Sequence, residues 1–463
     1  MAQGTRTARG TRTARGTRTA RGTRTARGAH TATRRRAVGA AVALSAAASL
    51  LGAPTSSAAP PDPRTPRTEI ISTAEDGTRG DGRSLLPETS DDGRYVVFAS
   101  EASNLVPGDT NGVGEVLVRA RRTGTLTRAG VGDDGRPSEH GAWDGKLSGN
   151  GRVVGFSSDD PALAPGERPP GGRYAYVRDL RTHRTEFVGI GPDGQPFQRS
   201  SLAALSGDGR YAAFLGYAEI PRPPFQVPTL YLRDRERGLT EAVSEPLPPG
   251  PLLSDVSLSA DGRHVAFRVY DHDRVNTASA VYVRDRRTGR LHHVNHTPGD
   301  PKPVSEWYGQ PSLSADGRYV AYVTNRDGLP ARHPFTLWEV FVHDLHTGRT
   351  VLASTAPGGG PLDKAARSPR ISPDGRYVAY TTAACATGEP DCRHAAYLRD
   401  LRRQDPEATR RVTVALDGGF PSHDVSAPVP ARGGCLVAFT SDSTNLVPDH
   451  PEQRDDVYVR HLC

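Results

Sequence analysis

The chain has 463 residues, of which 35% are hydrophobic, and it contains 50 glycines and 39 prolines. Its formal net charge of +7 would ordinarily indicate a nucleic acid or an acidic membrane as a partner, but residues 1–36 contain 11 arginines and no acidic residue, so the rest of the chain carries −4. The composition therefore argues against a nucleic-acid partner and, with so much glycine and proline, indicates many turns for each buried strand.

Residues 1–58 have the features of an export leader. Gly4 to Arg27 is four copies of Gly-Thr-Arg-Thr-Ala-Arg, a low-complexity sequence that cannot bury a core. An arginine triplet then precedes an apolar run from Ala37 to Leu51, and small residues follow it up to Pro60. This order is typical of a secretory signal peptide, and we expect cleavage after Ala58. The apolar run is shorter than the roughly 20 residues that span a bilayer, so we expect a secreted protein without a permanent membrane anchor.

After a short linker at residues 59–66, the chain repeats one pattern. Its clearest copy is Ser314 to Tyr322, which reads Ser-Ala-Asp-Gly-Arg-Tyr-Val-Ala-Tyr. In Asp-Gly-Arg the glycine can adopt the positive φ of a tight hairpin turn, and the aspartate can hydrogen-bond the local backbone. The copies follow one another at intervals of 53 to 59 residues, which indicates a repeat architecture. The turn glycines are Gly93, Gly151, Gly209, Gly262, Gly317, Gly375 and, in a degenerate copy, Gly434.

A second run, such as Val-Tyr-Val-Arg-Asp at Val281 to Asp285, follows 20 to 30 residues after most turns and predicts another strand. Each repeat then supplies four strands, and helical periodicity is almost absent. We therefore expect an all-β fold, a seven-bladed β-propeller of four-stranded antiparallel blades over residues 67–463. The last copy ends at its third strand, Val457 to His461, and an extra strand, Thr68 to Thr73, precedes the first copy. Pairing of this N-terminal strand with the last blade would close the ring.

This repeat resembles that of TolB-type, WD40-like β-propellers, which abound in bacterial envelope and secreted proteins. The motifs that carry the resemblance are Ser-x-Asp-Gly-Arg-Tyr-Val-Ala-Tyr and Val-Tyr-Val-Arg-Asp, and the match covers roughly residues 68 to 463. The resemblance implies the propeller fold. For activity it implies less, because such propellers serve as binding platforms, as accessory domains of peptidases and occasionally as lyase scaffolds.

All four cysteines lie in the last quarter of the chain, and an exported protein with an even number of cysteines is expected to form disulfides. Cys385 and Cys392 both fall in one loop of the sixth repeat. Cys435 begins the second strand of the seventh repeat and Cys463 follows its third strand, and these two strands run antiparallel. We therefore predict the pairs Cys385 with Cys392 and Cys435 with Cys463. A zinc site is disfavoured because no Cys-x-x-Cys pair is present.

Antiparallel strands place the short turns of all repeats on one face of the ring and the long, variable loops on the other. Variable loops on a rigid scaffold are where binding residues usually lie. Several aromatic residues fall there, which suits a sugar or a peptide, although they could equally cover only the blade tops. The predicted ligand-binding residues are Trp143, Trp307, Tyr308, Trp338, Tyr217 and Phe335, and Phe225, Tyr270 and Phe420 are further candidates.

One loop of the first repeat, Asp109-Thr110-Asn111-Gly112-Val113-Gly114-Glu115, spaces oxygen-bearing side chains around a glycine. Asp109, Asn111 and Glu115 are therefore candidate calcium ligands, but the loop lacks the bidentate acid of an EF-hand. The seventh repeat has the preceding Asn-Leu-Val-Pro without this spacing, which favours a structural turn. We expect no other cofactor.

No catalytic motif is present: the chain has no Gly-x-Ser-x-Gly, no His-Glu-x-x-His, no phosphate loop and no dinucleotide fingerprint. The recurring Asp-Gly-Arg arginines and Val-Arg-Asp aspartates predict structural ion pairs. We expect a secreted, monomeric, non-catalytic binding propeller whose partner is an extracellular glycan, a peptide or an envelope protein. The alternative is a propeller-fold polysaccharide lyase or glycosidase with a loop-borne active site. Its loop-face candidates are His140, His272, His333 and His423 with Asp144, Asp271, Asp273 or Asp424.

Overall fold

The computed structural model places part of the chain in detail. Contacts divide the chain into two units, Met1–Pro60 and Pro61–Cys463, and all described residues belong to the second unit. The described residues are 66–169, 171–217, 228–244, 252–270, 279–294, 308–325, 337–360, 362–384 and 393–463. Within these ranges, no helix is both long and apolar enough to cross a membrane.

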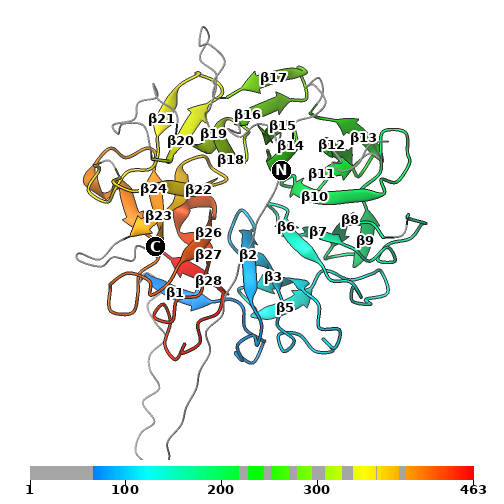
Figure 1. The fold of residues 1–463 in the computed structure, drawn as a ribbon, viewed down its shortest axis with the longest axis horizontal. Coiled ribbons are helices and arrows are strands. Elements are labelled where there is room, and N and C mark those ends of the chain that lie inside the picture. The colour runs from blue at the N-terminus through cyan, green and yellow to red at the C-terminus, as the bar shows by residue number, and fades with distance from the viewer. Residues whose placement is uncertain are drawn as a thin grey trace, which may run out of the picture. The chain divides into compact units, whose positions relative to one another are not determined.

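The described strands form seven separate sheets of four antiparallel strands, arranged in a ring (Figure 1). The first three blades are β2 (Ser84–Thr89), β3 (Tyr95–Ser100), β4 (Glu115–Ala120) and β5 (Thr125–Arg128); β6 (Trp143–Leu147), β7 (Val153–Ser158), β8 (Tyr174–Asp179) and β9 (Arg184–Phe187); and β10 (Arg199–Leu205), β11 (Tyr211–Tyr217), β12 (Pro228–Asp234) and β13 (Leu239–Ala242). The next three are β14 (Leu252–Leu258), β15 (His264–Tyr270), β16 (Ser279–Asp285) and β17 (Arg290–His293); β18 (Tyr308–Leu313), β19 (Tyr319–Thr324), β20 (Glu339–Asp344) and β21 (Thr350–Leu352); and β22 (Ala366–Ile371), β23 (Tyr377–Ala384), β24 (Arg393–Asp400) and β25 (Thr409–Arg411).

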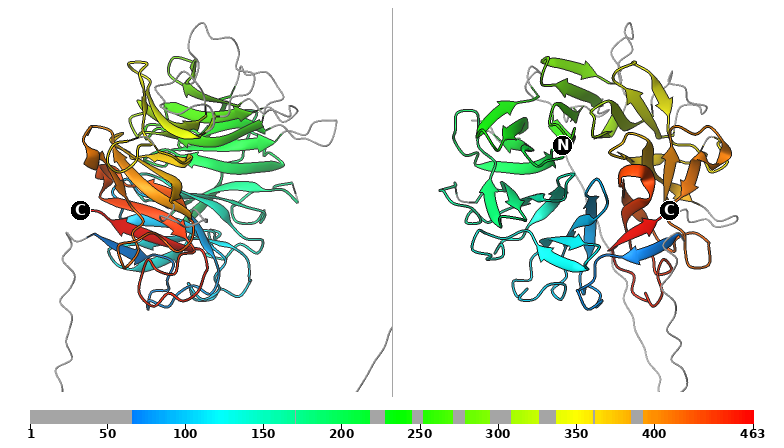
Figure 2. Two further views of the ribbon diagram at one scale, coloured as in Figure 1. Left: turned by 60° about the vertical axis from the view of Figure 1, so that its left-hand side comes forward. Right: turned by 180° about the vertical axis from the view of Figure 1, so that it is seen from behind.

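The seventh blade combines both ends of the described chain. Its strands are β26 (Val425–Pro430), β27 (Leu436–Ser441), β28 (Asp456–His461) and β1 (Arg67–Ile70). β1 pairs antiparallel with β28, from Arg67 opposite His461 to Ile70 opposite Tyr458, and the two strands lie side by side in Figures 1 and 2. The all-β, seven-bladed prediction is confirmed, and β28 has a neighbour where it would otherwise present an open edge.

The second and third strands of each blade are buried on both faces. In β3, for example, the consecutive residues Val96, Val97 and Phe98 are all fully buried, and consecutive side chains of a strand point to opposite faces. Six of the seven blades also place an aromatic pair across these two strands, a contact that stabilises a sheet. The pairs are Phe156–Tyr176, Phe214–Tyr231, Phe267–Tyr282, Tyr322–Phe341, Tyr380–Tyr397 and Phe439–Tyr458.

The Asp-Gly-Arg motif forms the predicted hairpin turn. In the first blade Gly93 has a φ of 69°, and Asp92 Oδ1 accepts hydrogen bonds from Ser90 Oγ at 2.8 Å and from the Arg94 amide at 2.9 Å. Ser90 Oγ accepts in turn from the Tyr95 amide at 3.0 Å. The serine and aspartate of the repeat therefore satisfy the polar groups of a turn that glycine makes possible.

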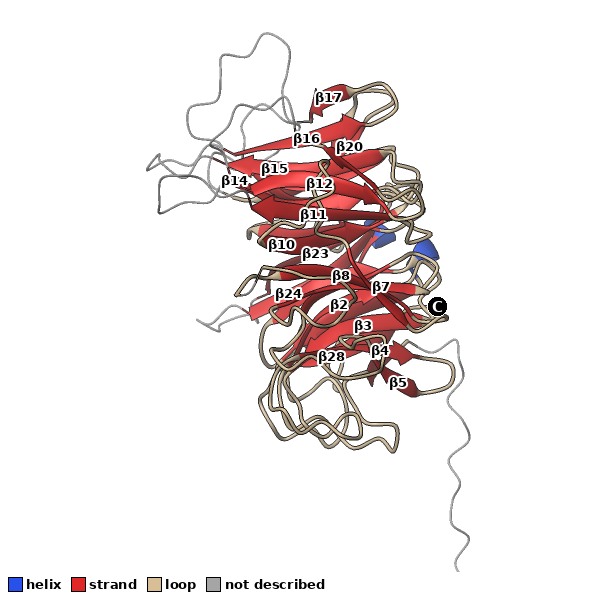
Figure 3. Ribbon diagram, turned by 90° about the vertical axis from the view of Figure 1, so that its right-hand side faces the viewer, coloured by secondary structure: helices blue, strands red, loops and turns tan. Residues whose placement is uncertain are grey.

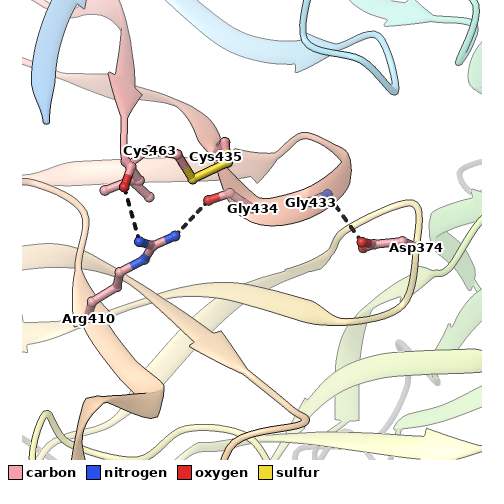
Figure 4. Close-up of a disulfide and its surroundings, with 7 residues drawn as sticks. Asp374, Arg410, Gly433, Gly434, Cys435 and Cys463 are labelled. Atoms are coloured by element: carbon pink, nitrogen blue, oxygen red, sulfur yellow. Dashed lines mark hydrogen bonds between the residues drawn. A yellow bond between two sulfur atoms is a disulfide. The ribbon is translucent and has the colours of Figure 1, made fainter. Parts of the chain in front are cut away.

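Backbone hydrogen bonds join these turns from blade to blade. The Ala260 amide donates to the Ala315 carbonyl at 2.8 Å, and the Ala315 amide donates to the Pro373 carbonyl at 2.9 Å. Pro373 has no amide hydrogen to continue the series. At that step the Gly433 amide donates to Asp374 Oδ2 at 3.2 Å instead (Figure 4). The two-residue stretch before each turn glycine thus links neighbouring blades as well as neighbouring strands.

The predicted ion pairs between the Asp-Gly-Arg arginine and the Val-Arg-Asp aspartate form within blades, between the second and third strands. The arginine-to-aspartate distances are 2.6 to 2.7 Å, and several pairs are bidentate. Burial by itself would raise the pKa of Asp179, but the pair with Arg152 and the backbone donors outweigh burial and lower that pKa to about 2. The pairs are Arg152–Asp179, Arg210–Asp234, Arg263–Asp285, Arg318–Asp344 and Arg376–Asp400.

In the seventh blade a disulfide takes the place of this ion pair, because Cys435 stands where the other blades have the arginine. Cys435 is bonded to Cys463, as predicted (Figure 4). Arg410 of the sixth blade donates to the Leu462 carbonyl at 3.2 Å and to the Gly434 carbonyl at 2.9 Å, which ties both sides of the disulfide to the neighbouring sheet. Cys385 and Cys392 lie outside the described residues, so their pairing stays a prediction.

Candidate functional site

The ring has two unlike faces, as the edge-on view in Figure 3 shows. One face carries the short turns, including two 3-10 helices, Pro406–Ala408 and Arg432–Gly434, and we call it the turn face. The other carries the long connections between second and third strands and between successive blades, and we call it the loop face. First strands begin at the loop face, second strands end there and third strands begin there, so residues at those ends share one surface.

The first strand of each blade lies nearest the ring axis (Figure 1) and contains a β-bulge. Its pairing with the second strand shifts register in every blade, for example between Leu85 and Glu88. In six blades the bulge holds a non-glycine residue with φ between 48° and 56°, a conformation that costs about 1–3 kcal/mol. These residues are Leu86, Asp144, Asp255, Gln310, Ser368 and Ala427. Sequence analysis did not predict the bulges, since each needs only one extra residue and no glycine.

Three charged side chains from three different first strands meet in the centre of the ring. Arg370 Nη2 lies 2.9 Å and Lys146 Nζ lies 3.4 Å from the same oxygen, Glu88 Oε1. Arg370 belongs to the sixth blade and Glu88 to the first. Their contact therefore spans the seventh blade, which lies between them in the ring. Burial by itself would raise the pKa of Glu88, but Arg370 and Lys146 outweigh it and hold that pKa below its ordinary value. The cluster has two cations and one anion.

The three residues of this cluster have the same position in their repeats, five residues before the turn glycine. The other four blades have small side chains there: Ala204, Ser257, Ser312 and Val429. Ser257 Oγ accepts from the Leu313 amide at 2.9 Å, and Ser312 Oγ accepts from the Ile371 amide at 3.1 Å, so both serines are committed to the neighbouring blade. The charges therefore come from the first, second and sixth blades, and the small residues come from the third, fourth, fifth and seventh. Aligning the repeats by their turn glycines would have found these three charges.

Arginines stack on aromatic residues at several places on the loop face. Besides Arg411 over Phe420 and Arg168 over Phe187, there are four such pairs. Arg173 lies over Trp143, with its guanidinium carbon 4.9 Å from the ring centre, and Arg268 lies over Tyr270 at 4.7 Å. Both arginines also contact carboxylates, since Arg173 Nε is 3.2 Å from Asp159 and Arg268 Nη1 is 3.5 Å from Asp255. These two positive charges are partly neutralised.

The other two stacked arginines carry free charges. Arg199 lies over Tyr217 at 5.8 Å, and Arg367 lies over Trp338 at 5.6 Å. Both arginines are exposed, and neither forms an ion pair with any residue that the structure describes. A guanidinium stacked on a ring keeps its N–H edge free for carboxylate or phosphate oxygens. Trp143, Tyr217 and Trp338, which the sequence proposed as ligand-binding residues, thus lie on the loop face beside arginines that the sequence analysis did not single out.

The remaining proposed aromatic residues are less informative. Trp307 and Phe335 lie outside the described residues, and Tyr308 is described only as the first residue of β18. Phe420, 38% exposed, lies under Arg411 at 4.2 Å. They stay predictions.

A histidine and an aspartate pair on the loop face at the boundary of the sixth and seventh blades. His394 Nδ1 lies 3.2 Å from Asp424 Oδ1, and the His394 amide donates to the same oxygen at 2.8 Å. Asp424 had been considered from the sequence, whereas His394 had not. Next to Asp424, His423 Nδ1 is 3.1 Å from Ser422 Oγ. Over the described part of the chain, no three His, Cys, Asp or Glu side chains are grouped closely enough to hold a metal ion.

Two of the proposed calcium ligands are engaged by other residues. Glu115 is nearly buried and pairs with Arg128 at 2.7 Å. The side-chain Nδ2 of Asn111 donates to the Ser138 carbonyl at 2.9 Å. Burial, only partly offset by Arg128 and reinforced by the nearby Asp109, raises the pKa of Glu115 above its ordinary value. In the seventh blade the positions of Asp109 and Glu115 hold His450 and Asp456, which lie 3.0 Å apart and are fully buried. Calcium at Asp109 stays a prediction.

The turn face has features of its own. A hollow of about 390 Å³ between the fifth and sixth blades is lined by residues that include Tyr319, Arg349, Val351 and Arg402. The aromatic residues proposed from the sequence do not line this hollow. Arg349 is exposed and forms no ion pair with any residue that the structure describes, so it is a turn-face counterpart of Arg199 and Arg367.

The fourth and fifth blades meet near the turn face through histidines. His264 follows the Asp-Gly-Arg arginine where most blades have tyrosine, and its Nε2 lies 3.9 Å from Asp285. His343 takes the place of the Val-Arg-Asp arginine, and its Nδ1 lies 2.9 Å from Thr350 Oγ1. His292 of β17 interacts electrostatically with both histidines. Burial lowers the pKa of each of these three histidines below its ordinary value.

Comparison with known proteins identifies the fold. No family model and no curated protein matches the chain. Among solved structures, an oligogalacturonate lyase in complex with manganese matches with 16% identity and a TM-score of 0.52, over 86% of this chain and 96% of that one. A prolyl endopeptidase matches with 13% identity and a TM-score of 0.52, over 84% of this chain and 50% of that one. TolB from Acinetobacter baumannii matches with 16% identity and a TM-score of 0.37, over 71% of this chain and 62% of that one.

At these identities the likenesses show the fold alone. The protein is a seven-bladed β-propeller, and TolB proteins are among the solved structures that it matches. Solved propellers that match this chain include both enzymes and TolB.

Proposed function

We propose that this protein is exported and binds an extracellular or cell-envelope ligand, a glycan or a peptide, on its loop face. The observation that carries the proposal is a set of four arginine-stacked aromatic residues on that face, two of whose arginines form no ion pair with any described residue. Such pairs combine a flat apolar surface with hydrogen-bond donors, and aromatic and arginine side chains dominate binding energy at many interfaces. Export is supported by the signal-peptide pattern of residues 37–58 and by the disulfide between Cys435 and Cys463.

The test is a glycan, peptidoglycan-fragment and peptide array probed with residues 59–463, with turnover assayed in parallel. Arg367→Ala should weaken binding of the ligand found, because it removes a free guanidinium from the loop face. Arg349→Ala is the matched control, since Arg349 is also exposed and without an ion pair among the described residues but lies on the turn face. Equal affinity of both variants and the unchanged protein would contradict the loop face as the binding surface.

A second candidate is a polysaccharide lyase or glycosidase. It is favoured by the His394–Asp424 pair, which places a possible proton acceptor on the loop face. Product formation that His394→Ala abolishes while ligand binding persists would establish this candidate. Binding without turnover for every saccharide tested would leave the binding function.

A further inference from the structure

We propose that the centre of the ring holds a subsite for the anionic group of an acidic saccharide, built from Lys146 and Arg370, with Glu88 as the internal anion that engages both cations when no ligand is bound. The inference rests on the proposed function and deepens it, because it names the class of ligand.

The charges of the cluster are the first reason. Lys146 and Arg370 share the single oxygen Glu88 Oε1, at 3.4 Å and 2.9 Å, so one carboxylate serves two cations. The cluster keeps a net charge of +1, and one further anion would balance it. Arg370 donates only one N–H to Glu88 among the described contacts. Its remaining donors can hold a carboxylate in the paired geometry that guanidinium groups favour.

The space beside the cluster is the second reason. Lys146 and Arg370 keep 27% and 37% of their side-chain surface exposed, so solvent reaches both cations. At the same level on the far side of the ring, the equivalent positions hold the short side chains of Ala204, Ser257 and Ser312. Glu88, Lys146 and Arg370 are each the second-to-last residue of a first strand, at the end away from the loop face. A saccharide that is bound on the loop face therefore reaches them by extending along the ring axis.

The backbone of the ring centre favours a saccharide over a peptide. One common way for a sheet to bind a peptide is the addition of a strand to a free edge. Here each first strand is interrupted by a bulge, and four of them carry a proline at the same position, six residues before the turn glycine, which removes an amide donor. The prolines are Pro87, Pro311, Pro369 and Pro428. A saccharide needs no such edge, since it is held by stacking and by charged donors.

The test uses matched probes. Hexuronic-acid oligosaccharides are compared by calorimetry with the same oligosaccharides after their carboxyl groups have been reduced to alcohols. The unchanged protein should bind the acidic form about tenfold to a hundredfold more tightly, as expected for hydrogen bonds to a charged group. This preference should shrink with added salt, because the cluster is accessible to solvent.

Variants separate a ligand site from a structural ion pair. Arg370→Gln should abolish the preference for the acidic form, whereas Arg402→Gln, on the turn face, should leave it unchanged. Glu88→Gln is the sharper variant, because removal of an internal competitor should strengthen binding of the acidic form several-fold. Its melting temperature shows whether the fold is retained, and a merely structural Glu88 would give unchanged or weaker binding.

The outcomes distinguish this subsite from the proposed function. If acidic and neutral saccharides bind equally and Arg367→Ala weakens both, the loop face binds a ligand and the subsite is refuted. If only peptides bind, the subsite is refuted and the loop-face function stands. If neither saccharide nor peptide binds, both proposals fail.

Discussion

Removal of the disulfide between Cys435 and Cys463 tests how the last blade is held. The bond closes a loop with a sequence separation of 28 residues. In the chain-entropy description, a cross-link of that size stabilises the folded state by about 3.5 kcal/mol at 25 °C. For a folded unit of about 400 residues, the entropy of unfolding is about 0.8 kcal/mol per degree, so the double variant Cys435→Ser/Cys463→Ser should melt about 4 °C lower.

The native contacts around the bond should survive the substitution. The Leu462 amide donates to the Cys435 carbonyl at 2.9 Å, and Arg410 still contacts the carbonyls of Leu462 and Gly434. The measurement is thermal unfolding in a background in which Cys385 and Cys392 are serine, with and without reductant. In the quadruple variant all four cysteines are serine. Reductant should lower the melting temperature of the background to that of the quadruple variant, and it should leave the melting temperature of the quadruple variant unchanged. An unchanged melting temperature on loss of the bond would refute the argument.

Three further predictions concern pH, calcium and the loop face. Burial lowers the folded pKa of His264, His292 and His343 below 6.5, so the unfolded chain binds more protons and the free energy of unfolding should fall as the pH falls from 6.5 through those lowered values. His264→Tyr, which restores the residue of most repeats, should reduce that slope between about pH 6.5 and 5 in urea titrations, and an equal slope would contradict the assignment to this group. Calcium should leave the melting temperature unchanged at neutral pH, since Arg128 already pairs with Glu115 and the Asn111 amide is engaged; a rise that Asp109→Asn abolishes would instead establish a calcium site. Trp338→Ala should weaken ligand binding about tenfold, the loss of one stacked ring and its ordered arginine, and unimpaired binding would remove Trp338 from the site.

A lower pH window belongs to the aspartates. The pKa of Asp179 is about 2 in the folded protein, against an ordinary value of 3.8. The pKa of Asp234 is also lowered, and the main cause is its hydrogen bonds with Arg210. Their stabilisation is therefore complete above the ordinary value and is lost as the pH falls through the folded value. Unfolding that steepens a second time below about pH 4 would separate these carboxylates from the histidines.

The repeat could be predicted from the sequence because each copy is a local unit. Ser-x-Asp-Gly-Arg makes its own turn through contacts within five residues, as Ser90, Asp92 and Gly93 show. The same holds for the pairing of Cys435 with Cys463, which follows from two adjacent antiparallel strands. In both cases the residues that contact each other lie in the same turn or in two adjacent strands.

The centre of the ring could not be predicted in this way. Glu88 and Arg370 are 282 residues apart in the sequence, and only closure of the seven-bladed ring brings Arg370 within hydrogen-bond distance of the Glu88 carboxylate. The bulges of the first strands likewise depend on how each sheet packs beside the ring axis, because neither leucine nor alanine, the residues at positions Leu86 and Ala427, favours a positive φ.

The sequence by itself determined the number of blades, the two faces and the turns, because a repeated motif reports its own local hydrogen bonding each time it occurs. The tertiary structure alone decided which arginines stack on Trp143, Tyr217 and Trp338 and which charges meet around Glu88. Those contacts join different strands and blades at single positions of the repeat, and one residue in one copy produces no periodic signal.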